Sequence, residues 1–392
     1  MIVIAGAGPA GAVAARLFAE AGFEVTLCDR KTFPRDKACG DGLIADAQSV
    51  FKTLGVDTEI AARARHVARF RLFSPGGIPI EFEGPFWVLP RRTLDAILFE
   101  SAMTAGATFR RVIVEGPLLD GETVIGVSGR DPASGAPVEI RAALTVVATG
   151  ANAAVLTRFA PGARPSASGF AIRAYAEPAD VRPPLDHLVA TVDRALPGYA
   201  WAFPAPGGLV NIGVGVFRGS GLREADVNLG GYLRSMLAGD GALGRIVGPL
   251  RTVERPIGAP LRTSLLGVGA GRKGLAVIGE AAGTTYALTG EGIGKAMESA
   301  MLLTSIVSSG RVSLLDAGER HREEMRSTFA SRFRAYAVAE RWITLPFFAD
   351  FVAKRANQSE WIRSRLSGLL SETFSADKVF SLRAFWHLLT HN

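Results

Sequence analysis

The first thirty residues alternate between apolar runs and a stretch rich in glycine. An apolar run that includes Val3 predicts a buried strand, and Ala15 and Ala19 recur at helical spacing after the glycines. A second apolar run ends at Asp29 and Arg30. Residues 3–30 therefore predict a strand, a glycine turn, a helix and a second strand. Residues 274–300 repeat the order strand, turn and helix far downstream.

The pattern between and after these two units predicts blocks of different structure. Residues 31–42 form a polar loop in place of a further regular strand, and the region after residue 311 is helical with a break at Pro346. The other predicted elements are helices over 44–54 and 93–105, the second capped by Thr93; a hairpin of 67–72 and 78–82; short strands over 118–141; a buried strand over 144–148; and an antiparallel sheet over 168–253 with one helix near 229–237.

The first glycine turn has the residues that a dinucleotide needs. Gly6 permits the tight turn after the strand, Gly8 lets the backbone approach a pyrophosphate, and Gly11 allows close packing of helix and strand. The helix N-terminus then offers free N–H groups to the phosphates. Asp29 follows at the distance where a carboxylate accepts the ribose hydroxyls. Together with the distant second turn, this predicts a large flavin held at both ends.

Composition narrows the alternatives. A chain of 392 residues is long enough for two or more domains, and its net charge of +7 comes without a block of like charge or a nucleic-acid-binding motif, so we expect no nucleic acid. Two cysteines give no disulfide framework and suit a cytoplasmic protein, and we expect no signal peptide and no membrane-spanning helix. Scattered histidines predict no metal site, and no Gly-x-Ser-x-Gly elbow supports acyl transfer.

Five ordered motifs between Ile2 and about Ser308 resemble the geranylgeranyl reductase family of flavoproteins, within the fold class of the aromatic hydroxylases. The two most specific are the cysteine–glycine loop over 37–43 and the aromatic strand over 199–204. The others are the glycine fingerprint, Arg91 before a helix, and the segment 279–293. The resemblance departs from the family at Glu280, where an aspartate is usual, at Thr149, and in the absence of a proline before Thr289.

The resemblance implies an α/β fold. A Rossmann-like FAD-binding domain of the glutathione-reductase and aromatic-hydroxylase type is interleaved with an antiparallel β-sheet substrate domain and followed by a C-terminal helical region. We assign residues 1–65, 91–165 and 257–310 to the FAD-binding domain. Residues 66–90 and 166–256 form the substrate domain, and residues 311–392 form the helical region.

The resemblance also assigns the site residues. Cys39 stands near the flavin ring as a proton donor or relay, although it is equally an inert small residue in a polar loop. Glu291 either binds a ligand or caps the helix that follows. The aromatic residues Tyr199, Trp201 and Phe203 share one face of their strand and are expected to wall the substrate cavity. The residues expected to bind FAD are Gly6, Gly8, Pro9, Ala10, Gly11, Asp29, Arg30, Cys39, Gly40, Arg91, Gly279, Glu280, Gly290, Gly292 and Ile293.

The function that this resemblance implies is FAD-dependent reduction of carbon–carbon double bonds in a prenyl chain. Reduced flavin gives a hydride to one alkene carbon, an acid protonates the other, and NAD(P)H or a ferredoxin-like donor reduces the flavin. A flavin-dependent monooxygenase or halogenase of an aromatic or polyketide substrate is the alternative on the same scaffold. A flavin-binding carrier without turnover is a third. The aromatic stretch 335–354 either contacts a membrane surface or packs on the flavin domain.

Overall fold

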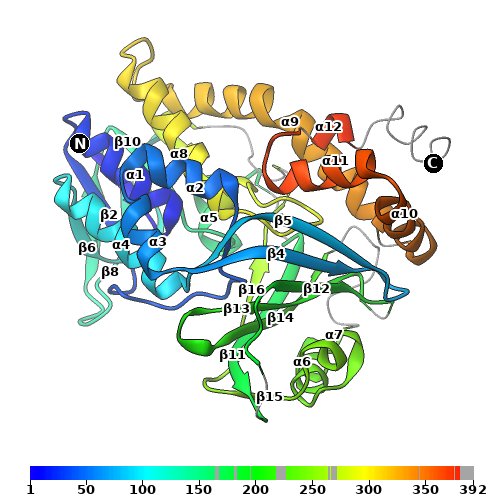
Figure 1. Cartoon of the computed structure of the whole chain (residues 1–392). Coiled ribbons are helices and arrows are strands. Elements are labelled where there is room, and N and C mark those ends of the chain that lie inside the picture. The colour runs from blue at the N-terminus through cyan, green and yellow to red at the C-terminus, as the bar shows by residue number, and fades with distance from the viewer. Residues whose placement is uncertain are drawn as a thin grey trace.

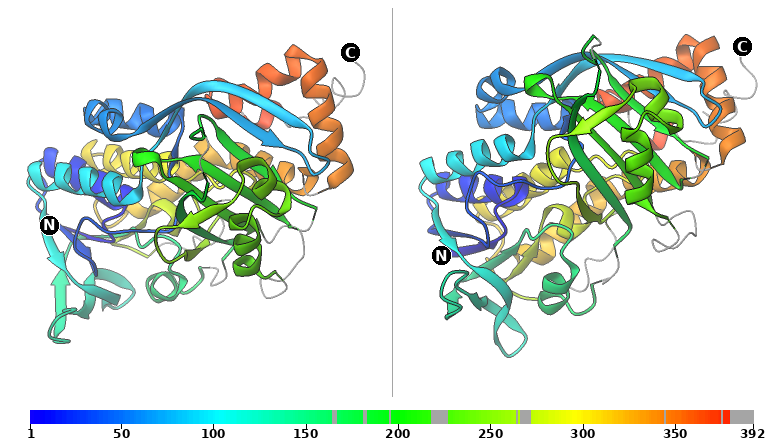
Figure 2. Two further views of the ribbon diagram at one scale, coloured as in Figure 1. Left: turned by 60° about the horizontal axis from the view of Figure 1, so that its bottom comes forward. Right: turned by 90° about the horizontal axis from the view of Figure 1, so that it is seen from below.

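The computed structural model describes residues 1–163, 167–180, 183–194, 196–217, 227–263, 265, 272–343, 345–374 and 376–379. Within them, the chain forms three β-sheets and several layers of helices (Figure 1). The fold is α/β, with a parallel sheet at the N-terminal end, a large sheet beside it and helices at the C-terminal end. Figures 1 and 2 place the N-terminus and the C-terminal helices at opposite ends of the molecule.

A five-stranded parallel sheet carries the two glycine turns. Its order is β17-β10-β1-β2-β6, and β1 and β10 are buried along their whole length, as strands covered on both faces must be. Because the strands are parallel, the glycine turn after β1, Asp29 at the end of β2 and Ala148 after β10 meet at one edge. The bounds are β1 Ile2–Ala5, β2 Val25–Asp29, β6 Thr108–Arg111, β10 Leu144–Val147 and β17 Leu275–Val277.

Different elements cover the two faces of the parallel sheet. One face packs on α1 Pro9–Glu20, α4 Arg91–Thr104 and α8 Ile293–Ser308, and this core continues into α2 Ala45–Leu54 and α3 Asp57–Arg63. The other face packs on a small antiparallel sheet and on α5 Ala153–Phe159. That sheet consists of β7 Ile113–Asp120, β8 Thr123–Arg130 and β9 Pro137–Arg141.

The large sheet has the order β15-β11-β14-β13-β12-β4-β5-β3, with β16 paired to β11. Its pairs are antiparallel except that β12 runs parallel to β4, with Leu188 opposite Phe70. The helices α6 Leu229–Leu237 and α7 Gly241–Val247 pack on this sheet. The bounds are β3 Gly42–Leu43, β4 Arg65–Phe73, β5 Pro79–Val88, β11 Gly169–Pro178, β12 Leu188–Val192, β13 Gly198–Pro204, β14 Val210–Phe217, β15 Leu250–Thr252 and β16 Ile257–Leu261.

The C-terminal helices bridge the parallel sheet and the large sheet. α9 Ala317–Ile343 packs on α8 and β17, while α10 Pro346–Gln358 and α11 Glu360–Leu370 pack on apolar residues of β4 and β5. The short α12 Ala376–Val379 returns to α9. Asp350 of α10 accepts hydrogen bonds from Ser74 Oγ and the Gly76 N–H, both at 2.6 Å, and so joins α10 to the tip of the β4–β5 hairpin.

Most predicted elements agree with the structure. The hairpin, the buried strand at 144–147, the helix at 229–237 and the break at Pro346 are confirmed. The Thr93 cap is wrong, because α4 begins at Arg91 after Pro90. The prediction also missed α3, α7 and the parallel pairing of β12 with β4. Residues 380–392 of the predicted helical region lie outside the described residues, and the division into domains remains a prediction. No described helix is long and apolar enough to cross a membrane.

Candidate active site

Two positions of the first glycine turn, Gly6 and Gly11, leave no room for a side chain. Gly6 has φ +107°, and a Cβ atom there would lie 2.4 Å from the Ala148 carbonyl oxygen. A Cβ on Gly11 would lie 1.8 Å from the Gly6 carbonyl oxygen, so α1 can approach β1 only with glycine at this position. The Asp29 carboxylate accepts the Ala7 N–H at 3.0 Å, which holds the carboxylate beside the turn.

Two guanidinium groups face this turn. A Cβ on Gly8, the N-cap of α1, would meet only Arg35 Nη2 at 3.6 Å and Arg91 Nη2 at 3.9 Å. Asp95 orients both arginines, since it binds Arg91 through two hydrogen bonds of 2.5 and 2.8 Å and Arg35 at 3.1 Å. Arg91 is buried, which by itself lowers the pKa of its guanidinium. The nearby carboxylates, Asp95 above all, raise the pKa by more than burial lowers it, so Arg91 stays charged. Two cations at a helix N-terminus are a suitable site for a pyrophosphate.

Residues 37–43 (the Cys39 loop) enclose a buried carboxylate. Asp41 has φ +63° and is fully buried, and its side chain accepts hydrogen bonds from the Tyr175 hydroxyl, from Asn211 Nδ2 at 2.8 Å and from the Arg91 N–H at 3.3 Å. Burial raises the pKa of Asp41 to about 6, although these donors favour the charged form. Asn211 also donates to the Cys39 carbonyl oxygen at 2.8 Å, so the network holds the loop from within.

Cys39 lies in the cavity wall with its thiol in the neutral form. Its Sγ accepts the Asp41 N–H at 3.3 Å. Desolvation and the charge of Asp41 raise the pKa of the thiol above its ordinary value, more than Arg91 and Lys37 lower it. The thiol is therefore not the activated thiolate of a nucleophilic cysteine.

The aromatic residues of β13 reach across two loops. The Trp201 ring covers Gly40, with Nε1 3.3 Å from where a Cβ of Gly40 would be, and the Phe203 ring covers Gly42 at 3.6 Å. Tyr199 at the other end donates to the Thr289 carbonyl oxygen at 2.5 Å. The stripe therefore connects the Cys39 loop to the second glycine segment. Trp201 is also anchored, because its Nε1 donates to Asn211 Oδ1 at 3.0 Å.

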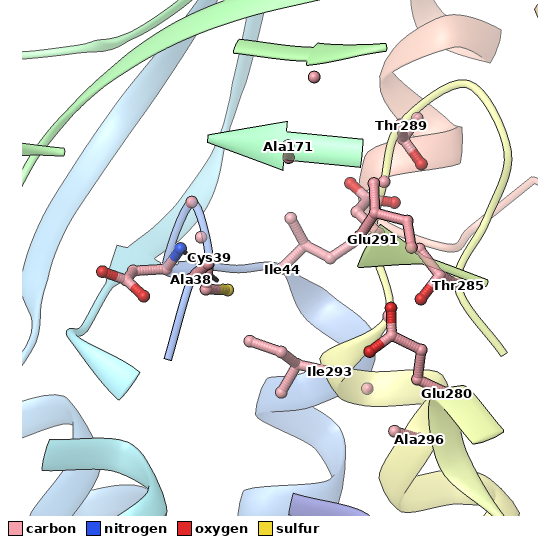
Figure 3. A pocket seen from close by; sticks show the side chains of 18 of the residues that line it. Ala38, Cys39, Ile44, Ala171, Glu280, Thr285, Thr289, Glu291, Ile293 and Ala296 are labelled. Carbon is pink, nitrogen blue, oxygen red and sulfur yellow. Dashed lines mark hydrogen bonds between the residues drawn. The ribbon is translucent and has the colours of Figure 1, made fainter. Parts of the chain in front are cut away.

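The second glycine segment runs from β17 through the short 3₁₀ helix Gly279–Ala282 to α8. Gly279 has φ +62°, and a Cβ there would lie 2.8 Å from Cβ of Ala10, so the segment packs directly on α1. Glu280 faces the Cys39 loop, with Oε2 3.4 Å from Lys37 Nζ. Gly290 and Gly292 fit closely against Tyr199 and Thr285. Figure 3 shows Glu280, Thr285, Thr289 and Ile293 around one side of the pocket, with Cys39 across from them.

A cavity of about 680 Å³ is lined by residues of both glycine segments, the Cys39 loop and the aromatic stripe. It begins at the first glycine turn, passes the Cys39 loop and the aromatic stripe, and ends among apolar side chains of the large sheet and the C-terminal helices. These include Phe70, Leu72 and Phe82 of the β4–β5 hairpin and Val352, Leu366 and Leu370 of α10 and α11. The far part of the cavity therefore suits an apolar chain.

The structure brings the predicted site residues together with one exception. All residues predicted from the sequence line this cavity except Gly11, which packs against the glycine turn. The analysis missed Arg35 and Asp41, although both lie in the predicted polar loop. It also missed the buried Arg173, which forms ion pairs with Asp36 and Glu254 below the Cys39 loop. For Arg35 and Asp41, their position in the polar loop was the only available signal.

These residues fit FAD. The open side of Gly8 between two arginines suits the pyrophosphate, and Asp29 suits a ribose. Gly40 and Gly290 both line the cavity beside the aromatic stripe and carry no side chain, so a flat ring can approach their backbone. Among the described residues, no cluster of histidine, cysteine and carboxylate side chains has the arrangement of a metal site.

Comparison with known proteins agrees with this site. Residues 1–178 match the family described as FAD binding domain. The chain is 32% identical to a menaquinone reductase of Mycolicibacterium smegmatis over 96% of this chain and 93% of that protein. It is 28% identical to digeranylgeranylglycerophospholipid reductase 1 of Methanopyrus kandleri over 95% of this chain and 98% of that protein. Both relatives are named as reductases.

Solved structures share the fold. A geranylgeranyl bacteriochlorophyll reductase-like protein of Thermoplasma acidophilum superposes with a TM-score of 0.77 at 19% identity, over 100% of this chain and 95% of that one. A flavin-dependent brominase superposes with a TM-score of 0.72 at 17% identity, over 100% and 99%. These structures show the fold alone, while the sequence relatives show the family and the match to the FAD binding domain shows the cofactor. The chain belongs to the geranylgeranyl reductase family of FAD-dependent oxidoreductases.

Proposed function

We propose that this protein reduces carbon–carbon double bonds in a prenyl chain. The observation that carries the proposal is the continuous cavity, which joins the Cys39 loop to an apolar region lined by the β4–β5 hairpin, α10 and α11. An isoprenoid chain offers almost no hydrogen-bonding groups, and most of the side chains that line the far wall are apolar. Menaquinone and digeranylgeranyl lipids, the compounds that name the two relatives, both carry chains of isoprene units.

Each group of residues has a role in this proposal. The turn from Gly6 to Gly11, with Asp29, Arg91 and Arg35, holds the nucleotide part of FAD. The ring lies near Gly40, Gly290 and the N-terminus of α8, and the residues Tyr199, Trp201 and Phe203 wall the substrate. When bound, reduced FAD supplies the hydride for the alkene. The protein positions the chain and keeps water away, and NAD(P)H or a ferredoxin-like protein supplies the electrons.

Anaerobic mixing tests the proposed reaction. The protein, loaded with FAD and photoreduced, is mixed with geranylgeranyl diphosphate, or with a menaquinone whose product is reoxidised from quinol to quinone before its mass is measured. Flavin reoxidation should accompany a mass gain of two hydrogens per reduced bond, measured by mass spectrometry. A flavin that stays reduced with every prenyl substrate would overturn the proposal and would favour a carrier or lipid-binding role. In the same anaerobic assay with catalytic amounts of the protein, oxidation of NADH, NADPH or reduced ferredoxin that depends on the prenyl substrate identifies the donor.

A monooxygenase or halogenase is the second candidate, and the shared fold of the brominase is the observation that favours it. The strand over Tyr199–Pro204 departs from the tryptophan-x-tryptophan-x-isoleucine-proline pattern of halogenases, and hydroxylases lack the cysteine–glycine loop. Oxygen uptake coupled to substrate, with a hydroxylated or halogenated product, would replace the reductase proposal.

We further propose that the start of α10 touches a membrane surface when the lipid substrate enters. Phe347 is 92% exposed and Leu345 is 57% exposed, beside the end of the cavity. Other residues of the predicted aromatic stretch 335–354 are not available for such a contact, because Tyr336 and Ala339 on α9 are buried inside the protein. Cosedimentation with anionic vesicles should weaken in a Leu345→Ser/Phe347→Ser variant. Leu119→Ser, at an equally apolar exposed position on a hairpin, is the control.

A further inference from the structure

Glu291 places in the cavity wall a carboxyl group of which one oxygen is buried without a hydrogen-bond partner in the described part of the chain. It lies between Gly290 and Gly292, immediately before α8, and lines the cavity. Its Oε2 is buried and has no hydrogen-bond partner among the described residues. The backbone there is held firmly, because the Glu291 carbonyl oxygen accepts the Tyr286 N–H at 2.8 Å. In Figure 3, Glu291 lies beside Thr285 and Thr289, on the side of the pocket opposite Cys39.

The surroundings of Glu291 keep its carboxyl group protonated. Burial, together with the charges of Asp46 on α2 and Glu372 after α11, raises the pKa of Glu291 to about 8, although a hydrogen bond with Thr289 favours the charged form. Lys295 on α8 opposes this effect only weakly, because it already pairs with Asp46 at 3.6 Å, Glu298 at 2.7 Å and Glu372 at 2.9 Å. The neighbouring phenols, Tyr199 on β13 and Tyr336 on α9, stay neutral because burial raises their pKa.

A neutral carboxylic acid whose pKa lies close to the working pH is an effective general acid. Cys39 is the other proton-bearing group predicted in the cavity wall. Its Sγ already accepts the Asp41 N–H. The ordinary pKa of a cysteine thiol, 9.0, is higher than the pKa of about 8 of Glu291, and burial raises the pKa of the Cys39 thiol above that ordinary value. The thiol is therefore the poorer proton donor at neutral pH.

We propose that Glu291 is the general acid that protonates the alkene, and this inference rests on the proposed reductase function. The O–H bond of the Glu291 carboxyl group breaks as a new C–H bond forms at one alkene carbon. The other alkene carbon receives the hydride, so the double bond gains two hydrogens and the two electrons come from the nicotinamide or ferredoxin-like donor. Glu291 is left as a carboxylate and regains its proton from water after product leaves.

The half-reactions of three variants test this role. Glu291→Gln keeps the shape and removes the proton, so flavin reduction by the donor should be unchanged while reoxidation by the alkene slows about 100-fold or more. Glu291→Asp should recover part of that rate. Wild-type reoxidation should fall as pH rises through about 8, and this descending limb should disappear in Glu291→Gln. Glu323→Gln, an exposed carboxylate on α9, is the matched control and should behave as wild type.

A second measurement needs no turnover. The folded pKa of Glu291 lies above the ordinary value of 4.5, so the folded state binds more protons than the unfolded chain between these values. Wild type should therefore lose stability relative to Glu291→Gln as pH rises from 5 to 9, as measured by urea unfolding at each pH. An equal difference at all pH values would overturn the protonated state of Glu291.

The outcomes separate this inference from the proposed function. Unchanged reoxidation in Glu291→Gln beside an active wild type overturns the role of Glu291 alone. Loss of reoxidation in Cys39→Ala but not in Glu291→Gln does the same and assigns the proton to the thiol. A wild type that binds FAD and converts no prenyl substrate overturns the proposed function itself.

Discussion

Asn211 of β14 donates a hydrogen bond of 2.8 Å to the carboxylate of Asp41, and so joins the large sheet to the Cys39 loop. The same amide nitrogen reaches the Cys39 carbonyl oxygen, and the amide oxygen accepts from Trp201. One side chain thereby sets the position of the loop and of the aromatic stripe above it. The Cys39 loop is thus held by a buried polar network that the large sheet completes.

Asn211→Ala should destabilise the protein and weaken the attachment of the Cys39 loop to the large sheet. The substitution leaves a buried carboxylate and an indole N–H without their partner, so we expect a loss of about 2–3 kcal/mol in the free energy of unfolding, with weaker FAD binding. Urea unfolding and flavin fluorescence titration measure the two effects. Asn357→Ala, which removes one exposed hydrogen bond to the Pro79 carbonyl, should cost about 1 kcal/mol or less and leave FAD binding intact. Equal losses in both variants would contradict the network.

Arg91 and Arg92 offer a matched pair at the start of α4. Arg91 is buried beside the glycine turn, while Arg92 is exposed. Arg91→Gln should lower the affinity for FAD about 10-fold or more, because a charge-assisted contact to phosphate is lost. Arg92→Gln should change the affinity less than about twofold. If fluorescence titration gives equal affinities for the two variants, Arg91 does not hold the cofactor.

Gly290 and Gly135 separate backbone strain from crowding. Both have positive φ, +68° and +71°, so alanine at either position should cost about 1 kcal/mol. A Cβ on Gly290 would also lie 2.8 Å from the Tyr199 hydroxyl, whereas a Cβ on Gly135 meets nothing within 4 Å. Gly290→Ala should therefore destabilise more than Gly135→Ala and reduce bound flavin, measured by thermal unfolding and visible absorbance. Equal flavin content in the two variants would count against a ring beside Gly290.

His321 should make the stability fall in mild acid. It is buried on α9 and donates to the Ser299 carbonyl oxygen at 2.9 Å, and burial lowers its pKa to about 4 from 6.5. Between these values the unfolded chain binds the proton and the folded protein does not, so stability falls as pH falls from about 6.5 toward 4. Asp46 and Glu291, whose pKa values are raised, act in the opposite direction over the same range.

A variant isolates the contribution of His321. His321→Gln keeps a donor and removes the titration, so the wild type should lose on the order of 2 kcal/mol more than the variant between pH 7.5 and pH 5. Urea unfolding at both pH values measures this difference. His66→Gln, at an exposed histidine on β4, should follow wild type. A His321→Gln curve parallel to wild type would refute the buried neutral state.

Local signals account for the parts of the site that were predicted. Gly6, Gly8, Asp29 and the segment after Gly279 follow from turns and short spacings, because a tight turn needs glycine wherever it occurs in the chain. Arg35 and Asp41 were missed because their importance depends on Asp95, Tyr175 and Asn211, which lie far away in sequence. The parallel pairing of β12 with β4 was missed for a similar reason. The alternation of apolar and polar residues predicts a strand but does not show which strand far away in sequence will lie beside it.

The sequence by itself determined the strand-turn-helix units, their glycines and the aromatic alternation of β13, since these depend on backbone sterics and short-range spacing. Only the tertiary structure decided which groups carry charge. Burial of Asp41 and Glu291 raises the pKa of each carboxyl group, and the partners that offset this effect come from other elements of the fold. Desolvation is a property of the packed chain, so the same glutamate in the unfolded sequence is an ordinary acid.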